Sequence, residues 1–206
     1  MITYRQASIT DINSIAKIHV SCFSGYFITS LGEKLISRYY QCYFEEDNLF
    51  VIAEDNGKII GFAMGYLLPS LARSRFEREN RFLLSVRMLK GFILFDKQTI
   101  NRCVERLKSL FEIKNKNKKK LDISGEFKAI EPPAALLSIA VMESFRGKGV
   151  SSTLIVEFEK LLHSRKVNSY SLSVFEDNDR ARKFYEKSNF ILGKRHGDSF
   201  TYIKNI

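Results

Sequence analysis

A short run of small and basic residues is the first indication of chemistry in this sequence. Arg146, Gly147, Lys148 and Gly149 stand directly before a segment whose apolar residues recur at helical spacing. The first N–H groups of a helix have no acceptors within the helix, and the helix dipole adds partial positive charge there. Glycine lets a ligand approach the backbone without a Cβ in the way, and the two cations add full charge. We therefore predict a phosphate-binding loop, with an ordinary surface turn as the alternative.

The segments on either side of this loop have the patterns needed to position it. The apolar run Leu136–Val141 is typical of a short buried strand, and residues 150–162 have the apolar spacing of an amphipathic helix. The order is thus strand, basic glycine-containing turn, helix. It fits neither the nucleotide P-loop, which needs a Gly five residues before Gly-Lys-Ser/Thr, nor the dinucleotide motif Gly-x-Gly-x-x-Gly.

The rest of the chain alternates between strand and helix patterns. The expected order is β-α-α-β-β-(insert)-β-α-β-α-β-β. Before the insertion we expect a strand at 2–5, a helix capped by Thr10 or Asp11, a helix at about 30–44, and a hairpin of 49–53 and 59–68 with its turn at 55–58. After the strand, loop and helix described above we expect a strand at 170–174, a helix capped at 177–179, and a closing hairpin of 190–192 and 200–203.

This order and two motifs resemble the GNAT superfamily of acetyl-CoA-dependent N-acetyltransferases. Residues Arg146–Ser151 resemble the family signature Arg/Gln-x-x-Gly-x-Gly/Ala, with Ser151 where Gly or Ala is usual. Residues Asn178–Tyr185 resemble Asn-x-x-Ala-x-x-Phe-Tyr, with Asn189-Phe190 in place of the usual Gly-Phe. The resemblance covers residues 2–69 and 134–206. It implies a mixed α/β (α+β) fold, with a central, mostly antiparallel, splayed mixed sheet flanked by helices.

The resemblance also implies an activity, that of an acyl-CoA N-acyltransferase. Acetyl would pass from acetyl-CoA, a co-substrate, to a primary amine by direct attack in a ternary complex, with no metal ion. The residues implied to bind the cofactor are Ile139, Ala140 and Val141 through the strand backbone, the loop residues Arg146, Gly147, Lys148, Gly149, Val150, Ser151 and Ser152, and Asn178. For the side chains of Ile139 and Val141, core packing is expected.

Two residues of the second motif have alternative structural roles. Tyr185 is the predicted acid, because a phenol with a pKa of about 10 can protonate a departing thiolate whose pKa is near 8.5. Its alternative role is to pack beside Phe184. Asn178 either contacts the cofactor or caps its helix, and the helix cap is favoured.

The general base is not identified by sequence. The strand before the loop carries no acid, although members of the family often have one there. A water-mediated base is an equal alternative to the remaining candidates, which all have plain structural explanations: Glu33, Glu54, Glu131 and His19. His163 and His196 lack the spacing of metal ligands, and no metal site is predicted.

The chain is expected to be a single domain, 1–206, with an insertion at 70–133. Between Leu71 and Lys120 it has fifteen Lys or Arg and five Asp or Glu, which accounts for the net charge of +10. Two helices and a mobile Lys-rich loop are predicted there. The apolar face of the first helix consists of Phe82, Leu83, Val86, Leu89, Phe92 and Ile93. The apolar face of the second helix consists of Val104, Leu107, Leu110 and Phe111, and the basic run 114–120 follows that helix.

Three interpretations of the insertion stay open. It lines the acceptor site and favours an anionic or carrier-linked amino sugar, it docks on an anionic membrane surface, or it covers an exposed flank. Because the charge is confined to one segment, nucleic acid is a less favoured partner. The pattern around 31–40 resembles a bacterial subgroup associated with surface-polysaccharide clusters.

Composition limits the class of protein. A hydrophobic content of 45% excludes a disordered chain, and no run of about 20 apolar residues indicates a membrane span. Three scattered cysteines indicate free thiols, and hence a cytoplasmic protein, with the inner membrane surface as a peripheral site. The alternative functions are a catalytically silent CoA-binding or regulatory domain, and a membrane or nucleic-acid binding module acting through the insertion. The oligomeric state is left open.

Overall fold

The computed structural model describes residues 1–25, 27–85 and 132–206. The chain divides into two compact units, 1–79 with 132–206 and 80–131, and the first unit holds the strands and most of the described helices. In the second unit, residues 81–85 are helical. The predicted apolar faces from Val86 onward, the Lys-rich loop 114–120 and Glu131 lie outside the described residues, so the predicted organisation of the insertion stays a prediction.

The apolar runs predicted as strands pair into one seven-stranded sheet, in the order β1-β2-β3-β4-β5-β7-β6. All neighbouring strands are antiparallel except β4 and β5. The strands are β1 (Ile2–Gln6), β2 (Leu49–Asp55), β3 (Lys58–Leu67), β4 (Ala134–Val141), β5 (Ser169–Phe175), β6 (Ile191–His196) and β7 (Ser199–Asn205). The mostly antiparallel mixed sheet that the resemblance implied is confirmed.

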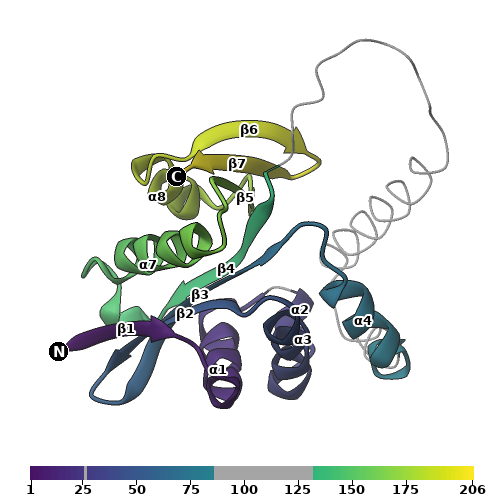
Figure 1. Ribbon diagram of the computed structural model, residues 1–206. Helices are drawn as coiled ribbons and strands as arrows, with labels where there is room; N and C mark the ends of the chain where they lie inside the picture. The colour runs from purple at the N-terminus through teal and green to yellow at the C-terminus, as the bar shows by residue number, and fades with distance from the viewer. Residues whose placement is uncertain (26, 86–131) are drawn as a thin grey trace, which may run out of the picture. The chain divides into compact units, whose positions relative to one another are not determined.

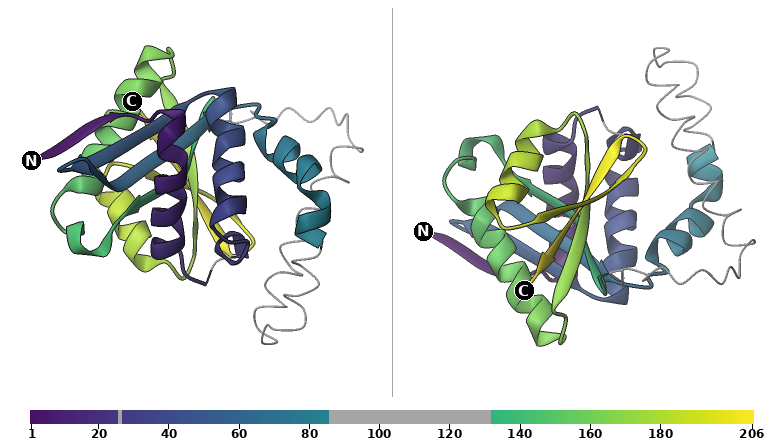
Figure 2. Two further views of the ribbon diagram at one scale, coloured as in Figure 1. Left: turned by 90° about the horizontal axis from the view of Figure 1, so that it is seen from below. Right: turned by 90° about the horizontal axis from the view of Figure 1, so that it is seen from above.

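Helices cover both faces of this sheet. One face carries α1 and α3, and the opposite face carries α7 and α8 (Figure 2). The helical segments are η1 (Ile9–Asp11), α1 (Ile12–Cys22), α2 (Phe27–Ser30), α3 (Glu33–Glu46), α4 (Ala72–Glu79), η2 (Glu143–Phe145), α7 (Val150–Ser164) and α8 (Asp179–Lys187). None of the helices in the described part of the chain is long and apolar enough to cross a membrane.

The local signals in the sequence place most of these elements correctly. The buried residues of α1 are Ile12, Ile15, Ala16, Ile18 and His19, which recur at helical spacing. The helix expected from about residue 30 instead begins at Glu33, because Gly32 has a φ of 84° and so interrupts the helical conformation. The turn between β2 and β3 has positive φ at both Asn56 and Gly57, as the hairpin signal indicated.

Strand β4 separates from β5 after only two residue pairs. Ala134 pairs with Tyr170 and Ala135 with Ser171, and the ladder ends there. On its other side β4 stays paired with β3 through Val141, with an irregularity between Met64 and Gly65. In Figure 1, β4 runs beside β3 while β5, β7 and β6 form a separate group. The splayed sheet is therefore present, and it opens toward the end of β4 that precedes α7.

Candidate functional site

The glycine-containing loop joins η2 to the first turn of α7, at the open end of β4. Gly147 and Gly149 have φ angles of 76° and 79°, a region that side-chain-bearing residues rarely adopt. An added Cβ at either glycine would meet no atom within 4 Å. The backbone of both residues is thus exposed to open space. A phosphate group could therefore approach the loop backbone closely at these two positions.

The N–H groups of the first turn of α7 point toward the same end of the helix. Gly149 is the N-cap residue and provides no side-chain hydrogen bond, and the first N–H that bonds within the helix is that of Thr153, to the oxygen of Gly149 at 3.1 Å. Among the described residues, the N–H groups of Val150, Ser151 and Ser152 have no acceptor. The first turn also lacks acidic residues. These groups together form a site for an anion.

The two cations of the loop are placed differently. The Nε of Arg146 donates to the carbonyl oxygen of Val141 at 3.1 Å, so this side chain joins the loop to the end of β4. Lys148 is exposed, and its Nζ lies 5.1 Å from the centre of the Phe145 ring. Lys148 therefore keeps its charge in solvent, while Arg146 has a structural contact in addition to its charge.

The backbone of β4 alternates between bonding to β3 and facing the opening. The N–H of Met142 bonds to Ile60 of β3 at 2.8 Å, and Ala140 pairs with Phe62. Because successive peptide groups of a strand point to opposite sides, those of Ile139 and Val141 face away from β3, where β5 has diverged. The Val141 carbonyl is already occupied by Arg146 and by the thiol of Cys22, whose Sγ lies at 3.5 Å. The N–H groups of Ile139 and Val141 thus face the opening, while their side chains pack with the core cluster.

The two residues of the second motif have clear structural positions. Asn178 caps α8, its Oδ1 accepting a hydrogen bond from the N–H of Ala181 at 3.1 Å, so the favoured structural role is observed. Tyr185 is 9% exposed, and its ring centre lies 5.3 Å from that of Phe190 and 6.2 Å from that of Tyr202. The Tyr185 ring therefore belongs to the core on the α8 face of the sheet.

Comparisons with known proteins agree with this geometry. Residues 123–190, which include β4, the loop and α8, match the model of the Acetyltransferase (GNAT) family. A comparison with curated protein sequences finds no match. Solved structures match over the whole chain at low sequence identity, which makes the fold the informative result.

Three of these structures illustrate the likeness. Protein PH1933 of Pyrococcus horikoshii is 16% identical, with a TM-score of 0.61, and the match covers 100% of this chain and 99% of that one. The PaiA N-acetyltransferase of Thermoplasma acidophilum, in complex with coenzyme A, is 15% identical, with a TM-score of 0.55 and coverage of 100% and 99%. The Escherichia coli ribosomal-protein-S18-alanine N-acetyltransferase is 18% identical, with a TM-score of 0.55 and coverage of 98% and 91%. This chain has the GNAT fold.

In this GNAT fold the two carboxylate candidates for a general base that the structure describes, Glu54 and Glu33, belong to β2 and α3 and not to β4. Glu54 is bonded to the guanidinium of Arg5 at 2.8 and 3.0 Å, and Arg5 in turn pairs with Asp11. Glu33 is exposed in the first turn of α3. The described residues contain no group of three or more His, Cys, Asp or Glu side chains that could hold a metal ion.

The remaining base candidate, His19, is part of a buried polar line that reaches β4. Its Nδ1 lies 2.5 Å from the hydroxyl oxygen of Tyr40, which bonds to Oγ of Ser138 at 3.2 Å. Burial lowers the pKa of His19 to about 4, so the ring is neutral at pH 7. Sequence reasoning named His19 but missed Tyr40 and Ser138. The available signal was that Ser138 is the one polar residue of the apolar β4 sequence.

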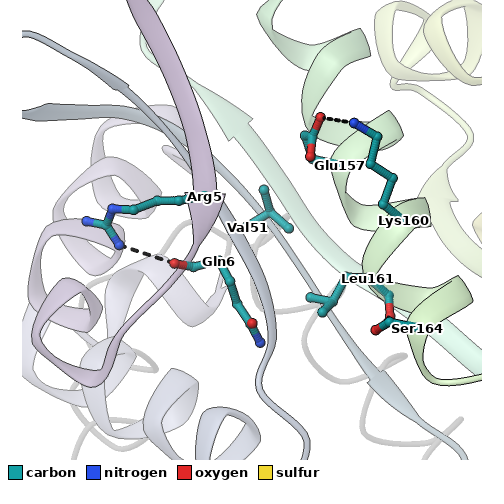
Figure 3. Close-up of a pocket in the computed structure, with 7 residues that line it drawn as sticks. All are labelled: Arg5, Gln6, Val51, Glu157, Lys160, Leu161 and Ser164. Carbon is teal, nitrogen blue, oxygen red and sulfur yellow. Dashed lines mark hydrogen bonds and ion pairs between the residues drawn. The ribbon is translucent and has the colours of Figure 1, made fainter.

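An open pocket of about 250 Å³ lies elsewhere, between the β1–β2 edge and the last turns of α7 (Figure 3). Its charged side chains already have partners: Lys160 bonds to Glu157 at 2.7 Å, and Arg5 to Asp11 and Glu54. This pocket is remote from the loop, which precedes the first turn of the same helix. We therefore assign it no part in the chemistry of the loop and β4.

Proposed function

We propose that this chain is an acetyl-CoA-dependent N-acetyltransferase that acetylates a primary amine by direct attack. The observation that best supports the proposal is the conjunction of two features. The open loop with positive-φ glycines precedes α7, and the unpaired edge of β4 ends shortly before this loop, with η2 between them. An anionic carrier and an extended acyl arm would thus be bound by consecutive stretches of backbone.

The loop supplies the binding site for the pyrophosphate in this proposal. The N–H groups of Val150, Ser151 and Ser152, with the helix dipole, would contact its oxygens, while Gly147 and Gly149 leave room for them. Lys148 would add its charge from solvent, and Arg146 would hold the loop against β4. The full set of proposed cofactor-binding residues stays Ile139–Val141, Arg146–Ser152 and Asn178, with Asn178 acting through its cap.

Acetyl-CoA would supply the activated acyl group. The N–H groups of Ile139 and Val141, which face the opening, would bind the acyl arm and polarise its carbonyl. Tyr185 would provide the proton for the departing thiolate, and the attacking nitrogen would release its own proton to a water molecule. The burial of Tyr185 in the α8 layer would exclude water from the transfer to the thiolate.

The loop assignment is tested by replacing Gly149 with glutamate. The new side chain would project a negative charge into the space proposed for the pyrophosphate, so we expect the affinity for coenzyme A, measured by calorimetry, to fall by ~100-fold or more. Gly57→Glu is the matched control, because Gly57 also has a positive φ and open surroundings but lies in the β2–β3 turn. Unchanged affinity in Gly149→Glu would refute the loop assignment.

Turnover is tested separately, by thiol release from acetyl-CoA across a panel of primary amines and with longer acyl-CoAs. Acceptor-dependent release is the expected result. Binding of coenzyme A without turnover would instead support a catalytically silent CoA-binding domain, an alternative that the lack of a carboxylate on β4 favours.

The finer predictions rest on sequence patterns alone. An anionic or carrier-linked amino sugar as acceptor, a peripheral membrane contact and a relation to surface-polysaccharide enzymes all rest on the charge of residues 70–133 or on the sequence pattern around 31–40. We retain them as proposals, together with a cytoplasmic location.

A further inference from the structure

The middle of β4 is the part of the strand that is accessible at the opening. Residues 137–139 are half-buried, whereas those before and after them in β4 are buried. They follow Ala135, the last residue that pairs with β5. A substrate that approaches an acyl group bound along β4 would therefore meet this stretch first. Ser138 is its polar side chain.

Ser138 is held in one orientation by a line of buried groups. The Tyr40 hydroxyl donates to Oγ of Ser138 at 3.2 Å, and the Tyr40 side chain is fully buried between α3 and the sheet. His19, at 5% exposure, contacts the same hydroxyl oxygen through Nδ1. The ring of Tyr40 is further fixed by edge contacts with Phe50 and Phe62. The line thus joins α1, α3 and β4.

The hydrogen-bond donors in this line are fixed by its two ends. The Thr29 hydroxyl donates to the carbonyl oxygen of Phe23, and the Tyr40 hydroxyl donates to Ser138. Neither hydroxyl has a second hydrogen to give, so the imidazole must donate to Tyr40 through a protonated Nδ1. His19 then carries an unprotonated Nε2, at 3.4 Å from Oγ1 of Thr29.

We propose that Ser138 binds the acceptor amine of the proposed acetyl transfer, with Tyr40 and His19 as its positioning residues. Tyr40 occupies one lone pair of Oγ, and among the described residues the second lone pair and the hydroxyl hydrogen of Ser138 have no partner. The second lone pair accepts an N–H of the neutral amine and directs the nitrogen lone pair at the acyl carbon. The uncharged hydroxyl of Ser138 thus acts as the hydrogen-bond acceptor at the place that a carboxylate would occupy on β4. The inference rests on the proposed function.

Kinetics of Ser138 variants test the inference. With the amine of the panel that gives the fastest thiol release, Ser138→Ala should raise KM for the amine ~5- to 10-fold, the effect of one lost hydrogen bond, and leave the affinity for coenzyme A unchanged. Ser138→Thr, which keeps the hydroxyl, should stay within ~3-fold of the wild type. Ser169→Ala, at the closed end of β5, is the matched control. A wild-type KM in Ser138→Ala overturns the inference and leaves the proposed function standing.

A second measurement examines the line without turnover. Nitrogen-15 NMR of histidine-labelled wild-type protein should show His19 with the proton on Nδ1, and Tyr40→Phe should alter that ring signal. A proton on Nε2 would overturn the positioning by Tyr40. If the wild-type protein did not bind coenzyme A, that result would instead refute the proposed function, and with it this inference.

Discussion

Tyr185 is the side chain for which the chemical and the structural roles must be separated. Its ring packs against Phe190 and Tyr202, contacts that a phenylalanine would preserve. Tyr185→Phe should therefore leave the affinity for coenzyme A within ~2-fold of the wild type and lower kcat ~10- to 100-fold, through loss of the thiolate's proton donor. Steady-state kinetics and calorimetry measure the two quantities. Full turnover in the variant would exclude Tyr185 as the acid.

His19 makes the stability of the fold depend on pH. Its pKa is about 4 in the folded protein, below the ordinary 6.5, because burial disfavours the charged ring. The unfolded chain therefore binds more protons between pH 6.5 and 4, and stability falls as pH decreases through this window. We expect His19 to account for a loss of about 2 kcal/mol in the free energy of unfolding between pH 7 and 5.

Urea unfolding of His19→Gln at the two pH values checks this expectation. The variant should be less stable at pH 7, because it disturbs the line to Ser138, but its stability should change less between pH 7 and 5. His163→Gln, at an exposed histidine in the last turn of α7, is the control and should keep the wild-type pH dependence. An equal pH dependence in His19→Gln and the wild type would show that His19 titrates normally.

At the scale of elements, the closed end of β4 depends on Gly65 of β3. A Cβ at this position would clash with the carbonyl oxygen of Ala135 and lie 2.5 Å from the ring of Phe158 on α7. Strands β3 and β4 and helix α7 thus meet at a point where only the hydrogen atom of a glycine fits. Gly65→Ala should lower the free energy of unfolding by about 1–3 kcal/mol, because this close-packed site cannot expand freely.

Gly193→Ala in β6 provides the comparison for this prediction. The nearest atom to a Cβ there is the oxygen of Thr201, at 3.1 Å, and β6 is exposed along its length. We expect denaturant melts to show a smaller loss than for Gly65. Equal losses in the two variants would mean that the contact with Phe158 does not limit the approach of α7 to the sheet.

At the scale of the whole molecule, the sequence predicts the helices, strands and turns that depend on neighbouring residues. Hydrophobic periodicity and turn residues report on a few neighbouring residues, and they identify the strand–helix order, the Asn56-Gly57 turn and the loop before α7. The start of α3 was misplaced because the φ of Gly32 is not a property of residue type alone. The resemblance to the GNAT superfamily added the splayed sheet, which pattern alone does not predict.

The tertiary structure decided which groups meet across the chain. His19, Tyr40 and Ser138 are separated by 21 and 98 residues, and Cys22 reaches Val141 across 119. Contacts over such distances follow from strand pairing and from the packing of α1 and α3 on the sheet, and a pattern of neighbouring residues does not contain them. The sequence by itself thus determined the loop and the order of the elements. Only the packed sheet determined that β4 opens beyond Ala135 and that a serine, fixed by buried groups, lies at that opening.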